Sequence, residues 1–181
     1  MSGPVVKPAP ISVLHPSGKA IIKSLKLAGI QYVVALPDII TSDGLLWPIS
    51  TDPDLKLVQV CKEDEGVSIC AAMSYSGTRA LLLMQQTGLM DSLNAIRAIG
   101  IDYQLPVCMM VGLQGKEPHL KPEDSASFGV RIVPPILKAM QLSYSLIEEP
   151  DDVLQIVPQI DTAYHNSSPH CFLIGRSPEV T

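Results

Sequence analysis

Residues 63–92 read EDEGVSICAAMSYSGTRALLLMQQTGLMDS, and this stretch decides the fold. Small and apolar residues recur through 63–76 and a glycine follows at Gly77, which predicts a helix with a glycine stop. The apolar run 80–84 is bounded by polar residues and has the length of a buried strand. A helix that leads into a buried strand is typical of an α/β domain.

The same alternation continues on both sides of this stretch. Further short apolar runs predict strands, and the stretches between them predict helices. The other expected strands cover 32–36, 55–60, 106–112, 144–147 and 171–174. The other expected helices cover 15–28, 91–100 (capped by Asp91 and closed by Gly100), 134–140 and 150–165. We therefore expect an α/β fold: a single domain with a mostly parallel six-stranded sheet and helices on both faces.

Length and composition restrict the class of protein. The chain has 181 residues, of which 46% are hydrophobic and 17% charged, as in a folded domain of ordinary size. We expect a Pro-rich lead-in over 1–14 and the domain over 15–181. The net charge of −5 and the lack of a basic stripe argue against nucleic-acid binding. No apolar run is long enough to span a membrane and 1–10 do not resemble a signal peptide, so a cytoplasmic protein is expected.

The four cysteines favour the same compartment. Cys61, Cys70, Cys108 and Cys171 form no Cys-x-x-Cys pair, and each lies in or beside an apolar segment. Such residues are typical of buried free thiols in a reducing cytoplasm.

Polar residues follow three of the expected strands. They are the Pro37-Asp38 pair, residues 61–65 and residues 85–91. Ligands of parallel α/β sheets bind outside the carboxyl ends of the strands. We therefore expect a ligand site at this edge.

The acids that open the 63–76 helix allow two interpretations. Carboxylates in a first turn stabilise a helix by complementing its dipole, and this structural role alone would account for them. Glu63, however, stacks at helical spacing over Gly66, Val67 and Cys70, none of which can pair with a carboxylate. A carboxyl group in that setting would lose hydration, so its pKa should rise and it could hold a proton near neutral pH.

The segment Gln85-Gln86-Thr87-Gly88 likewise fits two interpretations. It is an ordinary strand-to-helix turn, and it also places backbone N–H groups and short polar side chains at the sheet edge. Several other sites are excluded, because the sequence has no Gly-x-Gly-x-x-Gly after the first strand, no P-loop, no paired zinc histidines and no Gly-x-Ser-x-Gly elbow.

Taken together, these two segments resemble a known family. The pattern Glu-x-x-Gly-Val-x-Ile-Cys-Ala, then a strand, then Met-Gln-x-(Ser/Thr)-Gly-Leu, is similar to the pyrimidine-binding domain of phosphonopyruvate and sulfopyruvate decarboxylases. The resemblance covers about 17–176. It implies thiamine diphosphate as the cofactor, with Glu63 hydrogen-bonded to its aminopyrimidine and thereby promoting formation of the reactive ylide.

The resemblance also implies the remaining site residues. Pro37, Gln86, Thr87 and Gly88 are expected beside the cofactor, and no residue of this chain is expected to bind a metal. The expected substrate is a small 2-oxo acid, contacted by Asp38, Gln85, Asp91 and His119. His119 is also compatible with a plain surface position.

The sequence departs from the family in three places, of which the last two bear on the substrate. Ala72 replaces the usual Gly, Met90-Asp91 replaces Gly-Asn, and Gln114 stands where the family tends to have Arg. An anionic head group is best held by arginine or by N–H donors. We therefore expect the second charge of the substrate to matter less here.

The diphosphate-binding half is missing from the sequence. No Gly-Asp-Gly occurs, so Mg²⁺ and the diphosphate should be held by a separate β subunit. Self-association through the pyrimidine-domain interface is expected as well. Two alternatives stay open: a non-catalytic or regulatory partner subunit, and an unrelated flavodoxin-like binding module.

Overall fold

The computed structural model describes residues 14–180, so all but the last residue of the expected 1–14 lead-in lies outside the described part. Six strands form one sheet in the order β2-β1-β3-β4-β6-β5, and every neighbouring pair is parallel. The strands are β1 (Tyr32–Ala35), β2 (Lys56–Gln59), β3 (Ala80–Gln85), β4 (Cys108–Gly112), β5 (Ser143–Ile147) and β6 (His170–Ile174). The predicted α/β fold with six parallel strands is confirmed.

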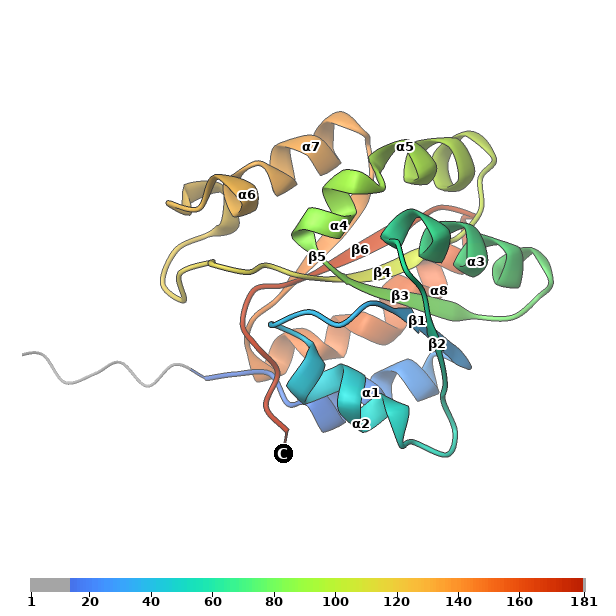
Figure 1. Ribbon diagram of the computed structural model, residues 1–181, viewed down its shortest axis with the longest axis horizontal. Helices are drawn as coiled ribbons and strands as arrows, with labels where there is room; N and C mark the ends of the chain where they lie inside the picture. The colour runs from blue at the N-terminus through green and yellow to red at the C-terminus, as the bar shows by residue number, and fades with distance from the viewer. Residues whose placement is uncertain (1–13, 181) are drawn as a thin grey trace, which may run out of the picture.

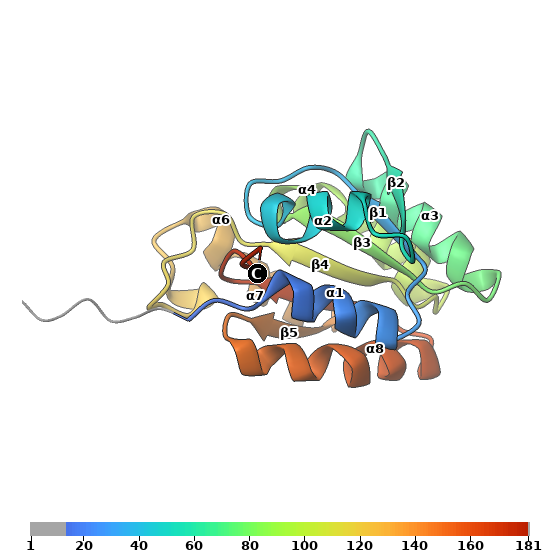
Figure 2. The same cartoon turned by 90° about the horizontal axis from the view of Figure 1, so that it is seen from below.

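Helices cover both faces of the sheet, as Figures 1 and 2 show. One face carries α1 (Gly18–Leu27), η1 (Ser42–Leu46), α2 (Trp47–Ser50), η4 (Pro150–Gln155) and α8 (Ile156–His165). The other carries α3 (Glu63–Tyr75), α4 (Gln86–Asp91), α5 (Leu93–Ala95), η2 (Ile96–Asp102), α6 (Phe128–Arg131) and α7 (Val133–Ala139). None of the helices within 14–180 is long and apolar enough to cross a membrane.

Two hydrophobic cores lie on the two sides of the sheet. Successive side chains of a strand point to opposite faces, so Leu81 and Leu83 join one core while Leu82 and Met84 join the other. All four are buried. This double burial explains why 80–84 is a continuous apolar run rather than an alternating one.

Two predicted helix boundaries are wrong. Asp91 does not cap a helix: α4 begins at Gln86, directly after β3, and Asp91 is its last residue. Gly100 does not end the next helical segment, which continues to Asp102. Gly100 instead permits close packing, because a Cβ there would lie 3.1 Å from the ring of Pro169.

The expectation of four buried thiols is correct for three of them. Cys70, Cys108 and Cys171 are buried free thiols, and burial raises the pKa of each, that of Cys108 to about 12. Cys61 is exposed, because it follows the edge strand β2, where the chain leaves the sheet.

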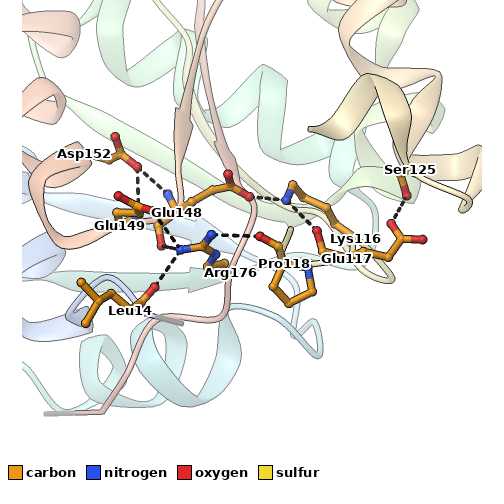
Figure 3. A network of polar contacts seen from close by, with 9 residues as sticks. All are labelled: Leu14, Lys116, Glu117, Pro118, Ser125, Glu148, Glu149, Asp152 and Arg176. Atoms are coloured by element: carbon orange, nitrogen blue, oxygen red, sulfur yellow. Dashed lines mark hydrogen bonds and ion pairs between the residues drawn. The ribbon is translucent and has the colours of Figure 1, made fainter. Parts of the chain in front are cut away.

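The long connection after β4 contains two short helical elements, η3 (Pro122–Asp124) and α6. Its first part is held by a buried ion pair (Figure 3). The Lys116 side chain is fully buried against the Glu148 carboxylate, and its ammonium group donates a 3.0 Å hydrogen bond to the Glu117 carbonyl. Lys116 follows β4 and Glu148 follows β5, so the pair links two separate segments at the carboxyl edge.

Arg176, just after β6, completes this network (Figure 3). Its guanidinium donates 2.9 Å hydrogen bonds to the carbonyls of Leu14 and Pro118, and it lies 3.4 Å from the Glu149 carboxylate. The segments that follow β4, β5 and β6 are therefore tied together by charge-assisted bonds.

Removing one partner of the buried pair should strongly destabilise the fold. Lys116→Met leaves the Glu148 carboxylate buried without its cation, which typically costs about 3 kcal/mol or more. Urea unfolding should therefore give a lower free energy of unfolding, and the double variant Lys116→Met/Glu148→Leu should recover most of the loss. Lys138→Met removes an exposed ion pair with Glu123 and should change stability by no more than ~0.5 kcal/mol. A double variant as unstable as the single one would contradict this account.

Candidate active site

The order in which strands are added to the sheet reverses at β1: β2 lies on one side of β1, and β3 and the later strands lie on the other. β1 is flanked by β2 on one side and by β3 on the other, so the segments that leave β1 and β3 diverge at the carboxyl edge. Divergence of this kind creates a crevice, the usual ligand position in such sheets.

A cavity of about 470 Å³ opens beside this crevice. It lies between the start of α3 and helix α4, and it is lined by Glu63, Thr87, Gly88, Met90 and Asp91. Four of these residues were predicted from the sequence as site residues, and the tertiary structure brings them to one place. Met90 was not among the predicted contacts.

Glu63 lies directly against Gly88. A Cβ atom at Gly88 would overlap the Glu63 carboxyl group, so the observed position of this carboxyl group depends on glycine at residue 88. Glu63 is half-buried, and its carboxylate has no hydrogen-bond or ion-pair partner within residues 14–180. It thus presents a free carboxylate to the cavity.

The two neighbouring acids are used locally. Glu65 accepts hydrogen bonds from the backbone N–H groups of Cys61 (3.2 Å) and Lys62 (3.3 Å) and so caps α3. Asp64 accepts a 3.0 Å bond from the backbone N–H of Glu65. The dipole-complementing role of first-turn acids therefore falls to these two, and Glu63 remains available.

Gln86 is buried and joins the ends of β3 and β4. Its side-chain amide donates a 3.0 Å bond to the Gln114 carbonyl and accepts a 2.9 Å bond from the Gln114 backbone N–H. Gln85 contacts the Gln114 side chain and lies 3.4 Å from the Thr87 hydroxyl. The expected contacts of these residues with a ligand remain predictions, and their observed contacts shape the turn.

Asp38 is also buried and already has donors. Its carboxylate accepts bonds from the backbone N–H groups of Ile40 (2.7 Å) and Thr41 (2.8 Å), and it also contacts the Thr41 hydroxyl. Pro37 before it is exposed at the same edge. The substrate role of Asp38 and the cofactor role of Pro37 remain predictions.

His119 lies apart from the other predicted site residues. It is exposed on the connection after β4 and is not among the residues that line the 470 Å³ cavity. Lys62, which the sequence analysis did not select, lies close to the cavity instead: its ammonium group is 3.6 Å from the Asp91 carboxylate. Its position immediately before Glu63 was the only available signal.

Metal ions in proteins need several ligand side chains grouped around one point. Within residues 14–180, no three histidine, cysteine, aspartate or glutamate side chains are grouped so that they could hold a metal ion.

The chain is similar to curated proteins of one kind. It is 31% identical over 173 residues to the sulfopyruvate decarboxylase of Methanosarcina acetivorans, a match that covers 93% of this chain and 41% of that protein. It is 25% identical to sulfopyruvate decarboxylase subunit alpha of Methanococcus maripaludis, over 78% of this chain and 83% of that subunit. The chain is similar to the sulfopyruvate decarboxylase family. The corresponding subunit of Methanothermobacter thermautotrophicus is 26% identical, over 80% of this chain and 86% of that subunit.

The extent of these matches differs within the sulfopyruvate decarboxylase family. The chain spans less than half of the Methanosarcina acetivorans protein but most of each protein named subunit alpha. No protein-family model matches the sequence.

Adding one methyl group at Gly88 should displace the Glu63 carboxylate without unfolding the protein. The Glu63 side chain can rotate away, so we expect Gly88→Ala to keep its free energy of unfolding within about 1 kcal/mol of the wild type, since alanine also favours the helix. A crystal structure of the variant should show the carboxylate moved out of the cavity. Gly129→Ala in α6 is the matched control, because a Cβ there meets no atom within 4 Å. An unmoved carboxylate in Gly88→Ala would contradict the steric argument.

Proposed function

We propose that this chain is the α subunit of a thiamine-diphosphate-dependent 2-oxo acid decarboxylase and binds the aminopyrimidine half of the cofactor. The observation that carries the proposal is the free Glu63 carboxylate, held against Gly88 in a cavity at the carboxyl edge of the sheet. Similarity to curated proteins adds the reaction class, because these proteins are named sulfopyruvate decarboxylases.

The residues of the cavity suit an aminopyrimidine. Its ring needs a carboxylate beside a ring nitrogen, and Glu63 has both oxygens available for such a bond. Gly88 lacks a side chain, so a flat ring can approach the backbone of α4 closely. Thiamine diphosphate, when bound, supplies the carbanion chemistry of the decarboxylation. The part of Glu63 is to orient the ring and to hold or release one proton at its carboxyl oxygen.

We infer that the diphosphate half of the cofactor is held outside this chain. The sequence has no Gly-Asp-Gly, and within residues 14–180 no three histidine, cysteine, aspartate or glutamate side chains are grouped around a possible metal position. Several relatives are named subunit alpha, and more than half of the Methanosarcina acetivorans protein lies outside its match. We propose that a second, β-type subunit holds Mg²⁺ and the diphosphate.

The proposed substrate is a small 2-oxo acid. Asp91 lines the cavity and places a negative charge where the family usually has asparagine. Lys116, which could have supplied a positive charge from the loop after β4, is instead buried against Glu148. Both features reduce the attraction of the site for a second anionic group.

Glu63→Gln should leave the fold intact and remove most turnover in the assembled enzyme. The amide cannot exchange the required proton, and loss of such a group typically lowers kcat by about 10²–10⁴-fold. Asp64→Asn is the control, because the Asp64 carboxylate serves only the local backbone and Lys62. The measurement is decarboxylase activity of the chain with its partner subunit. Full activity of Glu63→Gln would favour a non-catalytic role for this subunit. A larger loss of activity in Asp64→Asn than in Glu63→Gln would assign the catalytic role to Asp64 instead.

Binding of thiamine diphosphate should require the partner. Calorimetric titration of this chain with cofactor and Mg²⁺ should give little heat, because we assign the diphosphate and Mg²⁺ ligands to the partner, and addition of the partner subunit should produce tight binding. A chelator should then abolish it. Tight, Mg²⁺-dependent binding by this chain alone would contradict the division of the site between two subunits.

A further inference from the structure

We propose that Lys62 binds the anionic side-chain group of the substrate and that Asp91 competes with the substrate for this lysine. The pair would then set the charge preference of the enzyme. This inference rests on the proposed function and adds a residue that determines specificity.

The Lys62 ammonium group lies beside an acid of the Glu63 cavity. It is 3.6 Å from the Asp91 carboxylate, which lines the cavity, and 4.0 Å from that of Asp64. Both distances exceed those of a good charge-assisted hydrogen bond, so the three donors of the ammonium group are not committed to either acid. The Lys62 side chain is 59% exposed and can therefore reorient.

Three other cations from the segments after β4 and β6 already have partners. Lys116 is fully buried against Glu148. Arg176 donates to the carbonyls of Leu14 and Pro118, and Arg131 donates a 2.6 Å bond to the Ser125 carbonyl. Lys62 is therefore a cation that can exchange partners beside the cavity.

The pair can exchange because it is exposed. Such ion pairs contribute little to stability, so an incoming sulfonate or carboxylate can replace Asp91 as the partner of Lys62. Asp91 stays nearby after the exchange and repels the bound anion, which weakens the preference for anionic side chains. Removing Lys62 should thus weaken the preference for anionic side chains, and removing the charge of Asp91 should strengthen it.

The experiment compares kcat/KM for sulfopyruvate and for pyruvate, whose side chain is neutral, using this chain reconstituted with its partner subunit. Lys62→Met should lower the ratio of the two values about fivefold, and Asp91→Asn should raise it about fivefold, the range set by exposed charge pairs. The changes should appear mainly in KM for sulfopyruvate. Lys62→Arg should keep the wild-type ratio approximately, because it preserves the charge.

Lys23→Met is the matched control. It removes the same charge from an exposed position on α1, on the opposite face of the sheet, and should leave the ratio unchanged. An unchanged ratio in both Lys62→Met and Asp91→Asn would overturn the inference while leaving the decarboxylase assignment intact. Loss of assembly with the partner, measured by sedimentation, would also overturn it by assigning the pair to the subunit interface. Absence of any 2-oxo acid turnover by the wild type would instead overturn the proposed function.

Discussion

The parallel pairing of β1 with β3 and with β2 constrains everything at the candidate site. Ala35 pairs with Leu83 of β3 on one side and with Gln59 of β2 on the other, and most residues of β1 and β3 are buried. With helices on both faces, polar groups find hydration mainly where the strands end. Because β1 is flanked by β2 and β3, the segments leaving these strands diverge and leave room for a ligand.

The three acids at the start of α3 have different roles: two of them bind the backbone, and Glu63 faces the cavity. Glu65 accepts hydrogen bonds from backbone N–H groups before the helix, and Asp64 accepts one from the N–H of Glu65, so these two acids, and not Glu63, bind the backbone here. The lack of a side chain at Gly88 then leaves space for the Glu63 carboxylate. The Glu63 carboxylate, next to Gly88 of α4, is thus the acidic group that the cavity offers to a ligand.

At the carboxyl edge of the sheet, the segments after β3, β4 and β5 are held together by side-chain contacts. The Gln86 amide joins the first turn of α4 to the backbone after β4, and the buried pair of Lys116 and Glu148 joins that segment to the one after β5. These contacts connect α4 to the segment after β5 through residues 114–116. Residues expected to touch substrate from the long loop, such as His119, lie outside this set.

The sequence by itself determined the fold class, because short apolar runs and intervening helices leave little choice but a doubly covered parallel sheet. It also selected Glu63, since an acid stacked on small and apolar residues has no local partner. Only the tertiary structure decided the start of α4 at Gln86, because its amide is satisfied by Gln114, 28 residues away in the chain. The contact of Glu63 with Gly88, the burial of Lys116 and the proximity of Lys62 to Asp91 likewise join segments distant in sequence, and no local pattern encodes such distances.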